Sequence, residues 1–440
     1  MKKMRRFMLL VLIFALCGSI CAGCAQNNEA TTTTTTTAPA EVPPTKEYTA
    51  GTVTKLEYDE NTMLTYSEGS TLEDFEKYCA GLGKLGLEKV FDRDTVDVRC
   101  VAYLDGQEYI YAYYAKRIQE VRVTVGPKDT FCAGDCTDNT GVTATPTLTM
   151  VGQKPNKNNG QGFVFVLPDG RLILQDGGNW FDDIEPDLIY NAIKTVAPDP
   201  ENIVIAGWFI SHPHSDHIGA FLKFVTDCGQ DETIHVQRVI RSFAGEEWYD
   251  FEREDGTVED SGHYVLELEQ LCSTQLPDTQ LIQAHNGQIF DFGGAQVEIL
   301  HTVEDLLPAK DLGYINSSSM VIRVHIAGQT VLLLADTTST TATTLVDMYE
   351  DSLYSDMVQV AHHGMWSANE MLYFYTMADV LLWPTLPSVA KNWLMDEPMV
   401  AALKYAKDLY IAGTTLTTLE LPYSMVNNKQ EVLSTLMPAQ

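Results

Sequence analysis

The sequence predicts an α/β protein, in which a large α/β domain follows a small α+β domain. From about residue 145 onward, short apolar runs of strand length alternate with segments of helical periodicity, which is typical of α/β folds. Residues 48–128 instead combine one helical segment with alternating strands around a turn signal. With 440 residues and 45% hydrophobic content, the chain can bury one large core and a second, smaller one.

Residues 1–23 have the organisation of a signal peptide. Met1–Arg6 is basic, Phe7–Leu16 is an apolar core, and small residues precede Cys24. This pattern resembles a bacterial lipoprotein signal with Cys24 as the lipidated residue, although Cys21 stands where such signals usually have Leu. We therefore expect a protein attached to the cell membrane by a lipid and facing outside the cytoplasm.

Residues 24–47 are predicted to form a disordered tether. Thr31–Thr37 is an unbroken threonine run, Pro39, Pro43 and Pro44 follow, and large apolar side chains are almost absent. Such a segment cannot bury surface, so we expect it to be extended.

Residues 48–128 are predicted to form a small α+β accessory domain. A helix is expected to start at Ser70-Thr71 and to stop near Gly83, and the ranges 96–104 and 108–115 read as a hairpin followed by a strand at 118–125. The second hairpin strand is rich in tyrosine. Two interpretations stay open, an aromatic surface for a cell-wall or glycan partner, or the core and face of a sheet.

Residues 129–440 are predicted to form the larger domain. We expect strands at 163–167, 172–175, 203–210, 236–240, 295–300, 320–326, 330–334, 357–360, 380–383 and 418–421. We expect helices at 184–196, 220–227 and 399–409. Cys132 and Cys136 lie close enough in sequence to form a small disulfide loop, or they remain free thiols.

A candidate metal site follows the strand 203–210 directly. His212, His214 and His217 surround Asp216, although the whole chain has only 10 histidines. A solvated loop would not draw on histidine three times, whereas imidazole and carboxylate are the usual ligands of catalytic zinc. We expect His212 and His214 to share one ion and Asp216 and His217 to face a second.

The segment 212–217 resembles the H-x-H-x-D-H signature of the metallo-β-lactamase-fold hydrolases, and the resemblance extends over roughly residues 145–438. Asp176 ends an apolar strand in an Asp-Gly-Gly motif, and by this resemblance it orients the site. Asp336 matches the carboxylate that bridges both metals, and His362-His363-Gly matches the motif that completes the second metal's shell. The resemblance implies an αβ/βα sandwich with the metal loops along one edge.

One ligand of the family pattern is missing from this sequence. Asn316, followed by three serines, stands where the family has a further histidine for the first metal. This variant resembles the hydrolase domain of the DNA-uptake competence proteins. Asn316, His301 and, more remotely, His285 are the alternatives for the missing ligand, and an amide binds zinc less well than an imidazole.

The resemblance and the ligands together predict a surface-anchored hydrolase with two divalent ions, Zn²⁺ or alternatively Mn²⁺, and a metal-bound hydroxide as the nucleophile. We expect His362 to be a metal ligand and His363 to act in catalysis as a proton donor or oxyanion partner. Asp216 is expected to coordinate an ion and is the second candidate catalytic residue. A phosphodiester is the expected substrate. The alternatives are a carboxylic ester, lactone or β-lactam, or a non-catalytic surface binding protein with a structural metal.

The charge of the chain restricts its partners. With 29 basic and 60 acidic residues the formal net charge is −31. Nucleic-acid polymers usually require a basic surface, so we expect a small-molecule or cell-envelope substrate instead. The sequence does not indicate an oligomeric state.

Overall fold

The computed structural model describes residues 44–138, 142–154, 160–178, 187–249, 261–307, 314–366 and 368–437. The expected signal peptide, Cys24 and most of the expected tether lie outside the described residues. Residues 44–440 form one compact unit. Within the described ranges, no helix is long and apolar enough to cross a membrane.

The first elements build an antiparallel sheet with the strand order β1-β2-β6-β5-β4-β3. Its strands are β1 Thr52–Asp59, β2 Thr62–Glu68, β3 Glu88–Asp94, β4 Val98–Asp105, β5 Glu108–Ala115 and β6 Glu120–Pro127. Helix α1, Leu72–Lys84, starts where predicted, because the Thr71 hydroxyl accepts a hydrogen bond from the Asp74 amide and the Asp74 carboxylate accepts one from the Thr71 amide. Gly83 lies within the last turn of α1 and does not end it.

The tyrosines of β5 belong to the core. Tyr109, Tyr111 and Tyr113 are at most 1% exposed, and the Tyr111 ring stacks on the ring of His285 at 4.7 Å. The Tyr111 hydroxyl donates a hydrogen bond of 2.7 Å to the Asn286 carbonyl. These three side chains therefore pack against the larger part of the chain, which rules them out as an open glycan-binding surface.

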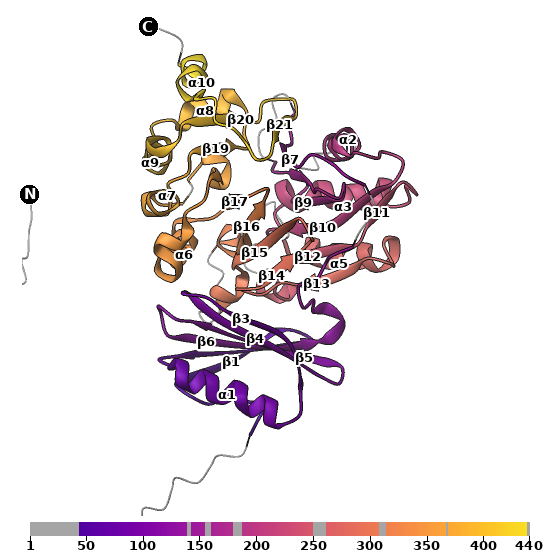
Figure 1. Ribbon diagram of the computed structural model, residues 1–440, viewed down its shortest axis with the longest axis vertical. Helices are drawn as coiled ribbons and strands as arrows, with labels where there is room; N and C mark the ends of the chain where they lie inside the picture. Colours follow the sequence, from indigo (N-terminus) through magenta and orange to yellow (C-terminus); the bar gives the residue numbers. More distant parts are fainter. Residues whose placement is uncertain are drawn as a thin grey trace, which may run out of the picture. The chain divides into compact units, whose positions relative to one another are not determined.

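The larger part of the chain contains two further sheets (Figure 1). The first has the order β13-β12-β10-β9-β8-β7-β21, with β11 also paired to β10, and the second has the order β14-β15-β16-β17-β18-β19-β20. The strands of the first sheet are β7 Thr147–Met150, β8 Phe163–Val166, β9 Leu172–Gln175, β10 Ile203–Ile210, β11 Ile234–Val236, β12 Arg238–Arg241, β13 Gln280–Gln283 and β21 Thr417–Glu420. Those of the second are β14 Ile289–Asp291, β15 Ala295–His301, β16 Val321–Ile326, β17 Gln329–Leu333, β18 Met357–Gln359, β19 Val380–Trp383 and β20 Asp408–Ile411.

Helices cover the outer face of each of these two sheets. The first sheet packs against α2 Asp187–Val196, α3 Ser215–Cys228 and α5 Ser261–Gln275. The second packs against α6 Ser339–Tyr349, α7 Glu370–Thr376, α8 Pro387–Trp393, α9 Glu397–Tyr405 and α10 Lys429–Leu436. A separate apolar cluster built from both sheets fills the space between them. This layering confirms the predicted αβ/βα sandwich.

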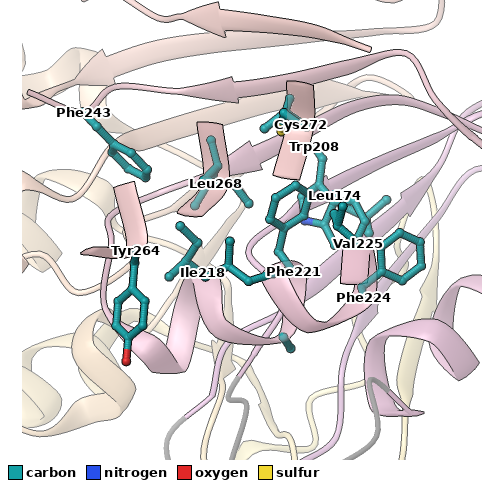
Figure 2. Packing of buried hydrophobic residues seen from close by; sticks show 14 of the residues in the cluster. Leu174, Trp208, Ile218, Phe221, Phe224, Val225, Phe243, Tyr264, Leu268 and Cys272 are labelled. Carbon is teal, nitrogen blue, oxygen red and sulfur yellow. The ribbon is translucent and has the colours of Figure 1, made fainter. Parts of the chain in front are cut away.

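Strand β10 shows how the sequence encodes these layers. Ala206 and Phe209 face the core between the sheets, whereas Trp208 and Ile210 face the helices. The Trp208 ring packs edge-on against Phe221 of α3 at 4.9 Å (Figure 2). A strand that is apolar on both faces is the expected sequence for the centre of such a sandwich.

Some predicted elements differ from the structure. The range 236–240 is divided between β11 and β12, with a break at Gln237. The predicted helix 399–409 ends at Tyr405, because Asp408 and the residues after it pair with β19 as strand β20. Helix α6 was not predicted, because its sequence is rich in threonine and has only a weak apolar periodicity.

Buried ion pairs link the small antiparallel sheet to the sandwich. Arg122 of β6 pairs with Asp305, and both side chains are at most 3% exposed. Arg93 of β3 pairs with Glu298 of β15, and its guanidinium also donates a hydrogen bond of 2.7 Å to the Gly287 carbonyl. A buried charge is costly without a partner, so these pairs fix how the two surfaces meet.

Candidate metal centre

The candidate ligands lie at the carboxyl ends of four strands. Asp176 directly follows β9, the 212–217 segment follows β10, Asp336 follows β17 and the histidine doublet follows β18. Strands β9 and β10 are parallel neighbours in one sheet, and β17 and β18 are parallel neighbours in the other. The four loops therefore meet at the same edge of the sandwich, as the sequence resemblance implied.

Helix α3 begins inside the histidine motif. His214 is its N-cap, and Asp216 and His217 lie in the first turn. This differs from the expectation of a loop and of a helix beginning near Gly219. The Gly177 amide donates to the His217 carbonyl at 2.8 Å, and a Cβ at Gly177 would lie 2.7 Å from the Phe221 nitrogen. The absence of a side chain at Gly177 therefore lets the Asp-Gly-Gly loop reach the start of α3.

One group of ligand atoms comprises Asp216, His217, Asp336 and His363, all within 4.8 Å of one another. The Asp336 Oδ1 atom lies 3.0 Å from His217 Nε2 and 3.6 Å from His363 Nε2. Asp216 Oδ2 lies 3.2 Å from His363 Nε2. Two imidazoles and two carboxylates with this spacing can surround one divalent ion.

A second group comprises His212, His214 and Asp336, whose ligand atoms also lie within 4.8 Å of one another. Asp336 faces this group with its other oxygen, since Oδ2 lies 4.0 Å from His212 Nε2. The rings of His212 and His214 are 4.9 Å apart. Asp336 is thus shared by the two groups, as predicted for the bridging residue.

The Nδ1 atoms of the buried imidazoles have hydrogen-bond partners that orient the rings. His217 Nδ1 donates to Asp176 Oδ2 at 2.8 Å, and His363 Nδ1 donates to the Pro384 carbonyl at 3.0 Å. His212 Nδ1 lies 3.0 Å from the Ser211 hydroxyl, which in turn lies 2.9 Å from Asp176 Oδ2. With Nδ1 occupied, the Nε2 atom of each ring is left to bind a metal.

Several polar atoms at this site are buried and have no hydrogen-bond partner among the residues that the structure describes. They are His212 Nε2, His217 Nε2, His362 Nδ1, His363 Nε2, Asp336 Oδ1 and Asn316 Oδ1. Buried polar groups without partners are unfavourable, and all of these atoms are metal-ligand types at one site. The residues therefore fit the two divalent ions that the family resemblance implies.

The charges of the metal-free site depend on these groups together. Burial lowers the pKa of His217, but the carboxylates of Asp336, Asp176 and Asp216 outweigh burial and raise it well above its usual range. The pKa of His363 is raised in the same way by Asp336 and Asp216. Binding of a cation must therefore displace protons from these rings, so the affinity for metal rises with pH.

The structure places the two histidines of the doublet differently from the prediction. His363, expected to be a proton donor, belongs to the ligand group of Asp216 and His217. His362, expected to be that ligand, instead has its Nε2 atom 3.6 Å from Asp336 Oδ2 and 3.0 Å from the Asn316 amide nitrogen. The reason is the turn Ala361–Gly364, in which both histidines have positive φ and the second one faces Asp216.

The other candidates for the missing ligand lie elsewhere. His301 Nδ1 donates to the Ser319 carbonyl at 3.0 Å, and its Nε2 atom lies 3.5 Å from Asp305 Oδ2. His285 lies between Glu304 and Tyr109, in the contact with the small sheet. Both histidines are structural, which leaves Asn316 as the one of the three candidates that contacts this site.

Apart from Asp176, the residues that support the ligands were not predicted from the sequence. Ser211 and Gln161 both donate hydrogen bonds to the Asp176 carboxylate. The backbone amide of Ser211 donates to Oδ1 at 2.8 Å, and the side-chain amide of Gln161 donates to Oδ2 at 3.1 Å. The Pro384 carbonyl, which orients His363, comes from the end of β19. Only Ser211 had a signal in the sequence, because it directly precedes the histidine motif.

No protein-family model and no curated protein matches the chain. Among solved structures, CmlA, a diiron β-hydroxylase from Streptomyces venezuelae, aligns with 14% identity and a TM-score of 0.35 over 63% of this chain and 54% of its own. The chain thus spans about half the length of that hydroxylase. MEM-A1, a subclass B3 metallo-β-lactamase from a soil metagenome library, aligns with 14% identity and a TM-score of 0.32 over 61% of this chain and 89% of its own.

A metallo-β-lactamase from Cronobacter sakazakii aligns with 17% identity and a TM-score of 0.30 over 49% of this chain and 73% of its own. The structure itself defines the fold, without these alignments. The defining features are the order of the strands in the sheets, the helices on both outer faces and the four loops at one edge. The chain has an αβ/βα sandwich fold of the metallo-β-lactamase type.

Replacing Asp176 tests how His217 and the 212–217 segment are supported. We expect Asp176→Ala to weaken metal binding by about 10- to 100-fold, because His217 and Ser211 lose their shared acceptor. Metal retention against a graded chelator, measured by elemental analysis, gives the change. Exposed Asp129→Ala is the matched control, and equal metal retention in the two variants would contradict this role.

Proposed function

We propose that this protein is a metal-dependent hydrolase that holds two divalent ions side by side and acts on a phosphodiester. The observation that carries the proposal is the position of Asp336. One of its carboxylate oxygens faces His217 and His363, and the other faces His212. A single buried carboxylate between two sets of imidazoles is the ligand arrangement expected for two adjacent ions.

Two ions about 3.5–4 Å apart are characteristic of phosphatases and nucleases, in which they contact both the attacking and the leaving oxygen. When bound, such ions lower the pKa of a water molecule and stabilise the negative charge of the reacting phosphate. Imidazole and carboxylate ligands suit Zn²⁺, and the two carboxylates also suit Mn²⁺. We propose Zn²⁺ first and Mn²⁺ as the alternative.

Differences in exposure indicate the side from which a substrate approaches. The side chains of His212, His217, His363 and Asp336 are at most 2% exposed, whereas those of Asp216 and His362 are 16% and 12% exposed. The open side therefore lies along Asp216 and His362. On this side, Asp216 is placed to accept a proton.

The choice of a phosphodiester rests on the motifs. The Asn316-x-x-Ser319 segment and the His-His-Gly motif resemble the hydrolase domain of the competence proteins. The net charge of −31 disfavours binding of a nucleic-acid polymer. It does not disfavour a small phosphodiester or one in the cell envelope, because the two metal ions would offset the negative charge of a single phosphate group. We therefore propose a small-molecule or cell-envelope phosphodiester.

The reaction class is tested with three model substrates, bis(p-nitrophenyl) phosphate, a lactone and nitrocefin. We expect turnover of the phosphodiester alone, its loss with a chelator, and its recovery when Zn²⁺ or Mn²⁺ is restored. His217→Ala should lose at least about 100-fold of this activity, because several kcal/mol of stabilisation depend on the ions.

The control for this assay is His235→Ala, which removes an exposed imidazole of β11. Chelator-sensitive turnover of nitrocefin or the lactone without turnover of the phosphodiester would contradict the proposed substrate class. Stoichiometric metal with no turnover of any substrate would favour the surface binding protein.

We also propose that a lipid on Cys24 holds the protein on the outer side of the cytoplasmic membrane. The basic, apolar and small-residue regions of residues 1–23 support this proposal. Cys24→Ala should move the protein from the membrane fraction to the soluble fraction of a bacterial host, with Cys228→Ala as the control. Unchanged membrane association of Cys24→Ala would exclude lipid anchoring at this residue.

A further inference from the structure

We infer that His362 and His363 bind different ions. The geometry assigns His363 to the ion beside Asp216 and His217, and His362 to the ion beside His212. His362 thus provides the third imidazole that the sequence lacks at the position of Asn316. This inference rests on the proposed two-ion function and names the ligand that completes its first site.

The two oxygens of Asp336 separate the doublet. Oδ1 is 3.6 Å from His363 Nε2, and Oδ2 is 3.6 Å from His362 Nε2. The same Oδ2 atom is 4.0 Å from His212 Nε2. His363 therefore lies beside Oδ1, the oxygen that faces His217. His362 lies beside Oδ2, the oxygen that faces His212.

The backbone of the doublet produces this separation. His362 has φ 48° and ψ 46°, and His363 has φ 53° and ψ 15°, so both adopt the left-handed conformation. Their ring centroids are consequently 6.2 Å apart, with 57° between the ring planes. A left-handed non-glycine residue costs about 1–2 kcal/mol, and such strain is typically found at functional sites.

Surrounding contacts hold this strained turn in place. The His362 amide donates to the Ala335 carbonyl at 2.9 Å, directly before Asp336, and Trp383 Nε1 donates to the His363 carbonyl at 2.6 Å. Gly364 follows with φ 80°, and a Cβ there would lie 2.4 Å from Trp383 Nε1. A turn fixed to the strand end that carries Asp336 keeps His362 beside that carboxylate.

Asn316 contacts His362 and not the ligand group of His363. Its amide nitrogen lies 3.0 Å from His362 Nε2, and its Oδ1 atom is buried without a hydrogen-bond partner among the described residues. The Nε2 lone pair cannot accept this hydrogen bond and bind a cation at once. If the Asn316 amide turns by 180°, the lone pair of His362 Nε2 becomes free to bind a cation. The same turn directs Asn316 Oδ1 toward that cation. Asn316 therefore positions His362 and can supply a weak oxygen ligand.

His362 must move slightly to join the group of His212 and His214. Its Nε2 atom is not among those that lie within 4.8 Å of one another there, which belong to His212, His214 and Asp336. The side chain of His362 is 12% exposed, so neighbouring residues do not enclose its ring on every side. His301 is not placed to join this group, because its two nitrogens face Ser319 and Asp305.

Metal stoichiometry of single and double variants tests the assignment. After dialysis against a weak chelator, we expect two ions in the wild-type protein and one in His362→Ala. The double variant His212→Ala/His362→Ala should also keep one ion, because both substitutions affect the same position, whereas His212→Ala/His363→Ala should keep none. The affinity of the protein for the lost ion should fall by more than the ~10–100-fold that follows when a residue hydrogen-bonded to a metal ligand is removed.

A matched control and a second readout separate metal binding from folding. His235→Ala should keep two ions, and His362→Asn, which tolerates the left-handed backbone, should behave like His362→Ala. The visible spectrum of the Co²⁺-loaded protein should lose one of two components in His362→Ala, while the circular dichroism of the metal-free protein stays unchanged. Two ions retained in both His362 variants would overturn this assignment alone, and a wild-type protein with fewer than two ions would overturn the two-ion function as well.

Discussion

The structure of the site depends on one buried carboxylate. Asp336 is 1% exposed and lies within 4.0 Å of imidazole nitrogens from His212, His217, His362 and His363. Burying a carboxylate is unfavourable unless positive charge surrounds it. In the metal-free protein the imidazoles supply that charge, chiefly His217, and hold the pKa of Asp336 well below its usual range against the opposing effect of burial. Metal ions would supply it more completely.

The sandwich brings these groups together at the ends of its strands. Asp176, Ala335, His362 and His363 all have positive φ, between 46° and 56°. Each of these residues lies at or shortly after the end of a buried strand. Each turns the chain so that a ligand residue, or a residue that hydrogen-bonds to a ligand, faces the edge of the sandwich where the four loops meet. The apolar packing of the two sheets and their helices offsets the cost of these turns, so the strain is concentrated where the chemistry is expected.

Much of the sandwich could be predicted from the sequence, because its buried strands are short apolar runs and its four motifs follow strand ends. The resemblance to the metallo-β-lactamase-fold hydrolases implied Asp336 as the residue shared by both ligand groups. The roles of His362 and His363 were not predictable, since two adjacent histidines differ only through the backbone angles of their turn. The contacts of His301 with Ser319 and Asp305 could not be predicted from the periodicity of the sequence either, because tertiary packing alone creates them.

If Asp336 holds both ions, its replacement with alanine should release both of them. Elemental analysis of Asp336→Ala after dialysis should find neither ion, whereas Asp129→Ala, an exposed control, should retain both. Loss of a single ion would show that one ligand group is complete without Asp336. Retention of two ions by Asp336→Ala would contradict the account.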